Sequence, residues 1–276
     1  MKQAHRQTPS GKTRARGAGV PFVGTPGEFN AITDVPGVEV GYQTLIRGHG
    51  PLVVGQGPVR TGVTAIFPRG YANPEGAAYA GFFNMSGNGE MSGAAFIEER
   101  GRFDGPITIT NTHSCGLTRD VTAKWLYSRH NSAEKVDQPF YLPVSAETHD
   151  GPLNDINGHH VTEADVIAAF EDARGGWIEE GSVGGGTGMR CFEFKGGSGT
   201  ASRVYPNPAA HGFWLDAPAL GGRVSLVDAQ GRILRSWERG ANAQEFFELG
   251  SLSAGWYVVV LERNGVVERH PLQIQP

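Results

Sequence analysis

The stretch that decides the fold reads EGSVGGGTGM at residues 180–189 and continues as RCFEFKGGSGTASR at residues 190–203. Ser182 lies among glycines there, so backbone from elsewhere in the fold can approach it closely. Such a loop suits two kinds of chemistry, the cradling of phosphate groups and nucleophilic attack by serine on a carbonyl. A glycine-rich loop with no chemistry is a third interpretation of the same spacing.

The residues around Ser182 exclude two familiar motifs. A P-loop ends in lysine followed by serine or threonine, whereas here Gly188 is followed by Met189 and Arg190. The nucleophile elbow of α/β-hydrolases needs glycine two residues before the serine, where this chain has Glu180. Nucleophilic attack by Ser182 therefore needs a different structural setting from these two.

The composition is that of a globular α/β protein. Hydrophobic residues make up 39% of the 276 residues and charged residues 19%, which is enough for a buried core. The net charge of −4 shows no basic excess of the kind that binding to nucleic acid or an acidic membrane surface needs. No apolar run approaches the roughly 20 residues of a membrane span. Residues 1–17 are basic and polar, with no apolar run of the secretory signal type.

Local patterns predict the elements of the first two hundred residues. Residues 1–20 are basic and contain proline, glycine and serine, which predicts a mobile arm. Alternating β-branched residues predict strands at residues 38–40 and 107–110. Apolar residues at helical spacing predict helices at residues 118–130 and 162–174, the second with a threonine N-cap.

The character of the chain changes near residue 203. Short strands without helical patterns are predicted at residues 223–227, 233–237, 256–263 and 266–274. Asn264-Gly265 between the last two is a strong hairpin signal. The tail is therefore expected to be a small β-sandwich, and the chain to consist of two domains, residues 1–203 and residues 204–276.

Several longer motifs accompany the Ser182 stretch in a fixed order. They read NAITDVPGV at residues 30–38, NGEMSG at 88–93, TNTHS at 110–114 and ETHDGPLNDI at 147–156. With the Ser182 stretch, they resemble the DmpA/BapA-type peptidases, the family of L-aminopeptidase/D-esterases and β-peptidyl aminopeptidases. The resemblance covers roughly residues 15–203.

This resemblance implies a fold and a reaction. The fold is an αββα sandwich similar in layout to N-terminal nucleophile hydrolases, and the chain is a precursor that cuts itself between Gly181 and Ser182. The freed amine of Ser182 then serves as base for its own hydroxyl, since an α-amino group has a pKa of roughly 7.7 to 8.0. The implied activity is release of N-terminal amino acids from short peptides, amides or esters through an acyl-enzyme, without a cofactor.

The resemblance also indicates supporting residues. Asn154 lies in the block that resembles the family's oxyanion segment, although turn formation explains an asparagine there as well. The substrate amine needs an anionic partner, for which Glu90 and Glu99 are candidates, and His113 is a candidate for the pocket wall. Acidic side chains of this kind are also common on solvated faces. No group of residues has metal-ligand spacing, so no metal is expected.

The tail carries a second resemblance. YPNP at residues 205–208, DAQGR at 228–232 and LSAGWY at 252–257 resemble the C-terminal sorting domain of the type IX secretion system. This implies the type IX secretion machinery as a partner and a secreted or cell-surface location. The absence of a visible signal peptide stands against that location.

The peptidase resemblance stops about 20 residues after Ser182, where the family continues with further strands and helices. The catalytic sandwich is therefore expected to be incomplete. Two functions remain open, a self-cleaving serine aminopeptidase or amidase, and a catalytically impaired, secreted peptidase-like scaffold that acts as a binding or structural module. The intact Gly181-Ser182 segment favours the first and the missing downstream part favours the second. The family also tends to assemble into multimers, so a homo-oligomer is expected.

Overall fold

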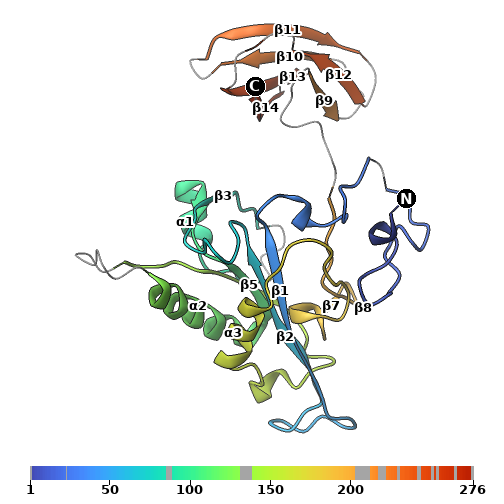
Figure 1. Cartoon of the computed structure of the whole chain (residues 1–276), viewed down its shortest axis with the longest axis vertical. Helices are drawn as coiled ribbons and strands as arrows, with labels where there is room; N and C mark the ends of the chain where they lie inside the picture. Colours follow the sequence, from blue (N-terminus) through green and yellow to red (C-terminus); the bar gives the residue numbers. More distant parts are fainter. Residues whose placement is uncertain are drawn as a thin grey trace. The chain divides into compact units, whose positions relative to one another are not determined.

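The computed structural model separates the chain into two compact units, Met1–Ser202 and Arg203–Pro276, each described by itself (Figure 1). The structure describes residues 2–22, 24–84, 89–130, 139–202, 212–216, 222–228, 231–240, 244–249, 252, 255–263 and 266–274.

A four-stranded sheet forms the centre of the first unit. Its strands are β1 (Glu39–Arg47), β2 (Val59–Phe67), β5 (Ile107–Asn111) and β6 (Val144–Thr148), in the order β1-β2-β5-β6. β2 runs antiparallel to both β1 and β5, whereas β5 and β6 are parallel. Parallel neighbours need a long crossover, which here contains the helix α2 (Cys115–Arg129).

Helices cover one face of this sheet. α2 and α3 (Glu163–Glu171) pack there side by side, as Figure 1 shows. Phe67 of β2 meets Trp125 of α2 at 5.7 Å and Phe170 of α3 at 5.6 Å between ring centroids, and the two helix rings are 4.8 Å apart. Burying a side chain of this size stabilises the fold by about 1.5–3 kcal/mol. These three rings therefore anchor the helix layer to the sheet.

Both predicted helices are confirmed, with ends that differ for local reasons. α2 begins at Cys115, earlier than residue 118, because Asn111 accepts a hydrogen bond from Ser114 N and starts the first turn. α3 begins with the predicted threonine cap but ends at Glu171 rather than at residue 174. It ends early because the backbone of Arg174 pairs with β1 at Val40, with N···O distances of 3.0 and 3.1 Å.

Short elements complete the first unit. They are η1 (Gln3–His5), η2 (Ile32–Asp34), β3 (Ala78–Tyr79), α1 (Ala94–Arg100), β4 (Arg102–Phe103), η3 (Thr112–Ser114), η5 (Ile156–Gly158), η6 (Gly184–Gly186), β7 (Arg190–Cys191) and β8 (Phe194–Lys195). Within the described part of this unit, one helix layer and one large sheet are present, which matches the expectation of an incomplete αββα sandwich. The second face of the sheet carries the Ser182 loop instead of another sheet.

The prediction of a mobile arm at residues 1–20 is wrong for the described residues 2–20. Arg14 is buried, and its guanidinium bonds to Glu180, 166 residues away in the sequence. His5 is also buried and bonds to the carbonyl oxygen of Gly27 at 2.8 Å. The basic composition predicted solvent exposure because these partners are distant in the sequence.

The tail is a β-sandwich. One sheet has the order β11-β10-β13-β14 and the other pairs β12 with β9. The strands are β9 (Gly212–Asp216), β10 (Gly222–Val227), β11 (Ile233–Arg239), β12 (Gln244–Glu248), β13 (Gly255–Arg263) and β14 (Val266–Ile274). Side chains of both sheets, among them Leu226, Phe247 and Leu261, share one core. The predicted turn residues Asn264 and Gly265 lie outside the described residues, but the flanking strands pair up to Arg263 and Val266. The sequence missed β9 and β12.

Candidate active site

The Ser182 loop is fixed on the helix-free face of the central sheet. Gly184 N donates to Thr44 Oγ1 at 2.9 Å, and Gly185 N donates to Thr64 Oγ1 at 3.1 Å. A Cβ on Gly62 of β2 would lie 2.7 Å from the carbonyl oxygen of Gly184, and Gly184 itself has φ +53°. Both positions therefore require glycine, which explains the glycine run physically.

The peptide bond between Gly181 and Ser182 has an unusual hydrogen-bond environment. Gly181 and Ser198 exchange two backbone hydrogen bonds of 2.8 Å each, and the Gly181 carbonyl oxygen also accepts from Val183 N at 2.9 Å. This oxygen therefore receives two N–H donors. Donors of this kind stabilise the oxyanion that forms when a nucleophile attacks a carbonyl.

Ser182 is exposed and opens into a cavity of about 520 Å³. The other lining residues are Ile46, His49, Gly50, Pro58, Arg60, Leu153, Thr187 and Lys195. Lys195 Nζ donates to the carbonyl oxygens of Gly186 at 3.2 Å and Gly196 at 2.6 Å. Partial burial lowers the pKa of Lys195 below its ordinary 10.5, so its ammonium releases a proton more readily than that of a fully solvated lysine. The cavity thus joins an apolar wall to a serine and a cation.

A second cavity of about 260 Å³ lies over the same face of the sheet. Its walls include Val40 and Tyr42 of β1, Ile66 of β2 and Glu147 of β6, and Ser198 also lines it. Burial raises the pKa of Tyr42. The Gly181–Ser198 bridge therefore lies next to both cavities. Ser198 lines the second cavity, and Ser182, the residue after Gly181, lines the first.

Asn154 lies in a buried polar cluster beside the first cavity. Its Oδ1 accepts from Arg60 N at 2.9 Å, its Nδ2 donates to Asp150 Oδ1 at 3.1 Å, and only 3% of the residue is exposed. Its neighbour Leu153, but not Asn154, lines the Ser182 cavity. An oxyanion role for Asn154 stays a prediction.

The other candidates from the sequence lie away from the lining of the Ser182 cavity. Glu90 and Glu99 are exposed, and Glu99 pairs with Arg100 at 3.5 Å. His113 is exposed as well and stacks on His159, with centroids 5.6 Å apart. The structure does not bring these three side chains to that cavity.

Sequence reasoning missed several charged and polar residues that do line the cavities, among them Lys195 and Glu147. Both stand inside quoted motifs, Lys195 in CFEFKGG and Glu147 at the start of ETHDGPLNDI. Nothing in the spacing sets them apart from other charged residues.

Within the described residues, no group of three or more His, Cys, Asp and Glu side chains could hold a metal ion. Nor does any described helix combine the length and apolarity that crossing a bilayer demands.

The buried carboxyl of Asp150 gives a pH-dependent prediction. Burial raises the pKa of Asp150 above its ordinary 3.8, although hydrogen bonds from Thr61 and Asn154 act the other way. The folded state therefore holds this proton more tightly than the unfolded state, and stability falls as pH rises from 3.8 through the folded-state pKa. Asp150→Asn should remove that fall. Thermal unfolding over this pH range checks it, with Asp120→Asn on the exposed face of α2 as control. Equal pH slopes for the parent and Asp150→Asn would contradict the prediction.

Known proteins resemble the chain in both units. Residues 30–217 match the model of peptidase family S58, and residues 203–275 match the secretion system C-terminal sorting domain. The beta-peptidyl aminopeptidase BapA of Sphingosinicella microcystinivorans is 55% identical over 191 residues, which are 69% of this chain and 47% of the relative. BapA of Sphingosinicella xenopeptidilytica is 50% identical over the same shares. The chain thus spans about half the length of the curated relatives it matches.

Solved structures show the same relationship. The L-aminopeptidase D-Ala-esterase/amidase of Ochrobactrum anthropi, described as a variant of the Ntn hydrolase fold, superposes with a TM-score of 0.61 at 36% identity. The match covers 90% of this chain and 56% of that one. A β-aminopeptidase from Burkholderia superposes with a TM-score of 0.58 at 35% identity, again over 90% of this chain and 56% of the other. The loop geometry, the sheet that carries it and the extent of these matches agree: the chain belongs to peptidase family S58 and carries a secretion system C-terminal sorting domain.

Proposed function

We propose that this chain is a serine aminopeptidase or amidase that splits itself between Gly181 and Ser182 and then uses Ser182 as an N-terminal nucleophile. The observation that carries the proposal is the pair of hydrogen bonds to the Gly181 carbonyl oxygen, 2.8 Å from Ser198 N and 2.9 Å from Val183 N. An ordinary loop carbonyl needs one partner or water. Two N–H donors on the carbonyl before an exposed serine favour acyl transfer at this bond.

The self-cleavage step needs no group from outside. Ser182 Oγ attacks the carbonyl carbon of Gly181, the C–O bond forms, and the bond from that carbon to Ser182 N breaks. The hydroxyl proton ends on the departing amine. Water then hydrolyses the Gly181–Ser182 ester, which leaves a carboxylate on Gly181 and a free hydroxyl on Ser182. After the C–O bond forms and before the C–N bond breaks, the Gly181 oxygen is negatively charged. The N–H groups of Ser198 and Val183 donate hydrogen bonds that stabilise this oxyanion.

The second reaction uses the amine that the first one frees. A serine α-amine with a pKa of roughly 7.7 to 8.0 can take the proton of its own hydroxyl near neutral pH. The hydroxyl then attacks the substrate carbonyl to give an acyl-enzyme, which water hydrolyses. Asn154 is proposed as a further oxyanion donor, since its amide lies next to the cavity-lining Leu153.

The substrates proposed are short peptides, amides or esters with a free N-terminal amine. The named relatives are a beta-peptidyl aminopeptidase and an L-aminopeptidase D-Ala-esterase/amidase, and an aminopeptidase acts on a substrate with a free N-terminal amine. Glu90 remains a proposed partner for the amine, because its carbonyl oxygen accepts from Glu147 N at 3.0 Å and Glu147 lines the second cavity. Glu99 and His113 have no comparable support in the structure.

The test of self-cleavage is the intact mass of the purified chain. Splitting gives two masses, for residues 1–181 and 182–276, whereas an uncut chain gives one. A single mass in freshly purified and in aged protein would contradict the proposal. It would favour the second candidate function, a peptidase-like scaffold that binds or organises a partner, for which the second cavity on the helix-free face of the central sheet is the supporting observation.

We propose the domains as residues 1–203 and residues 204–276, the second being a sorting module for type IX secretion that brings the protein to the cell surface or the medium. A reporter with a signal peptide and residues 204–276 should leave a host that carries this system. The same reporter with residues 252–276 removed is the control, because it lacks β13 and β14 of the sandwich. Export of both or retention of both in the periplasm would contradict the assignment.

A further inference from the structure

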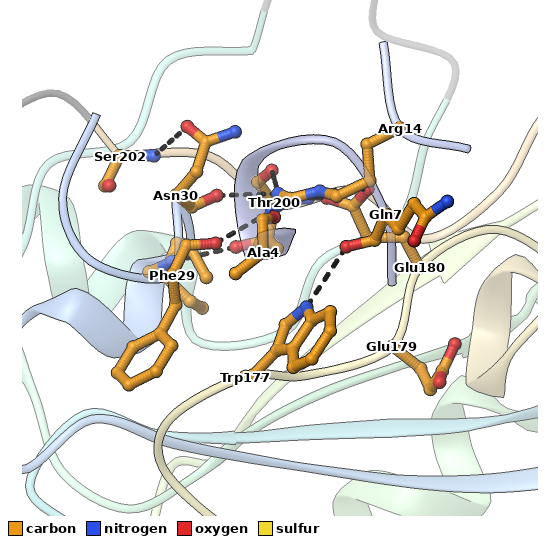
Figure 2. A network of polar contacts seen from close by, with 12 residues as sticks. Ala4, Gln7, Arg14, Phe29, Asn30, Trp177, Glu179, Glu180, Thr200 and Ser202 are labelled. Atoms are coloured by element: carbon orange, nitrogen blue, oxygen red, sulfur yellow. Dashed lines mark hydrogen bonds and ion pairs between the residues drawn. The ribbon is translucent and has the colours of Figure 1, made fainter. Parts of the chain in front are cut away.

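The N-terminal arm, residues 2–20, lies along the segment that immediately precedes the Gly181–Ser182 bond. Trp177 Nε1 donates to the carbonyl oxygen of Gln7 at 3.2 Å. The backbone N and the hydroxyl of Ser10 donate to the two carboxylate oxygens of Glu179 at 2.6 and 2.9 Å. Figure 2 shows the arm beside Trp177, Glu179 and Glu180, so contact continues along the segment toward the bond.

Arg14 makes the densest of these contacts. Its Nε and Nη2 donate to the two carboxylate oxygens of Glu180 at 2.9 and 2.8 Å. Nη1 donates to the backbone carbonyl oxygens of Ala4 and Phe29, and Nη2 is shared between Glu180 and the carbonyl oxygens of Asn30 and Thr200, as drawn in Figure 2. The side chains of Arg14 and Glu180 are 4% and 18% exposed, so the pair is shielded from solvent.

This arrangement differs from a surface ion pair. An exposed pair contributes little, whereas removing one partner of a buried pair leaves an uncompensated charge. All three nitrogens of the Arg14 guanidinium have partners, in a planar fork that a lysine ammonium cannot reproduce. The arrangement of acceptors around residue 14 therefore fits an arginine side chain and not a lysine.

The Arg14 contacts lie at both ends of the bridge that polarises the Gly181 carbonyl. Glu180 is the residue before Gly181, and its Oε1 also accepts from Thr200 N at 3.0 Å. Thr200 follows Ser198 by two residues, and its carbonyl oxygen accepts from Arg14 at 3.0 Å. Arg14 thus ties the segment that carries Gly181 to the segment that carries Ser198.

We infer that the N-terminal arm, through Arg14, is a positioning device for self-cleavage at Gly181–Ser182. The inference rests on the self-cleavage proposed above. Arg14 and Glu180 hold the Gly181 carbonyl in register with the N–H of Ser198, so that the oxyanion donor is in place before Ser182 attacks. After cleavage, Arg14 and Glu180 belong to residues 1–181 and Thr200 to residues 182–276, so the same contacts hold the two fragments together.

The experiment compares self-cleavage rates of the full chain by intact mass. Arg14→Ala should cleave about a hundredfold more slowly, because a small displacement of reacting groups costs that much. Arg14→Lys should be slowed similarly, since it keeps the charge but not the fork. Millimolar guanidinium should restore part of the rate to Arg14→Ala and none to Arg14→Lys. Arg16→Ala is the matched control. Among the described residues, the Arg16 side chain bonds to Phe22 alone, so this variant should cleave at the parent rate.

A second measurement separates this inference from the proposed function. In the Ser182→Ala background, hydrogen exchange of the Gly181 and Ser198 amides reports the bridge without any cleavage. Adding Arg14→Ala should speed exchange at both amides at least tenfold, and adding Arg16→Ala should not. If the parent chain never splits, the proposal of self-cleavage is wrong. The exchange rates of the Gly181 and Ser198 amides still test whether Arg14 positions the bridge. Parent-like cleavage in Arg14→Ala, or equal exchange in the two arm variants, would overturn the inference.

Discussion

Ser182→Ala is expected to give one intact chain where the parent gives two fragments, residues 1–181 and 182–276. The substitution removes the hydroxyl that we propose attacks the Gly181 carbonyl. It leaves the loop otherwise unchanged, because Ser182 is exposed and no bond of the Gly181–Ser198 bridge involves its side chain. Intact mass at successive times after purification measures the outcome. Ser182→Cys keeps a nucleophile and should still split. A split between residues 181 and 182 in Ser182→Ala would mean that another protease cuts the loop.

Substitutions at Ser198 separate the backbone donor from the side chain. Ser198→Ala loses only the hydroxyl bond to the Val183 carbonyl oxygen, 2.8 Å, and should split at nearly the parent rate. Ser198→Pro removes the N–H that donates to Gly181 and should slow splitting by about 10² to 10³, the usual cost of losing one oxyanion donor. Equal rates in these two variants would show that the Ser198 amide takes no part.

The base for the second reaction can be checked in a chain that begins at Ser182 and is combined with residues 1–181. One extra residue ahead of Ser182 turns its amine into an amide, which cannot accept the proton. Peptidase activity should be lost while the fold is kept. Full activity in the extended chain would require another base, and Lys195 is then the first group to substitute because it shares the cavity with Ser182.

Local patterns predicted the elements whose signals are local. The α3 cap is an example, since Thr162 and Asp165 bond each other three residues apart. The arm could not be predicted, because Arg14 finds its carboxylate partner 166 residues away and its basic neighbours resemble a solvated tail. The early end of α3 has the same origin, as Arg174 is drawn into a bridge with Val40 of a distant strand.

The candidate site shows the same limit. The glycines around Ser182 allow the close backbone approach seen in the structure, so the sequence alone could single out this loop and Ser182 as the candidate nucleophile. Charged residues that line the cavity have no comparable local sequence pattern. Glu99 and His113 have side chains suited to binding, but neither lines the Ser182 cavity, whereas Lys195 reaches it from a two-residue strand, β8.

Turnover of aminoacyl p-nitroanilides by this chain is expected to be about a thousandfold or more below that of a full-length relative. The chain spans 47% of the BapA sequences it matches, and Ser182 lies exposed rather than enclosed. Phe192 and Phe194, next to the cavity residue Lys195, are 85% and 76% exposed, which marks an apolar surface without a covering layer in the described residues. A site open to water weakens electrostatic stabilisation and positioning, each of which contributes several kcal/mol to such reactions.

The comparison is made at equal concentrations of cleaved protein, so that slow maturation does not lower the apparent turnover. Ser182→Ala sets the background, and the relative of Sphingosinicella microcystinivorans is the reference. The deficit should lie in kcat more than in KM, because open contacts to water affect the transition state more than they affect ground-state binding. Turnover within about tenfold of the reference, a gap of only ~1.4 kcal/mol, would show that one sheet and one helix layer suffice for the chemistry.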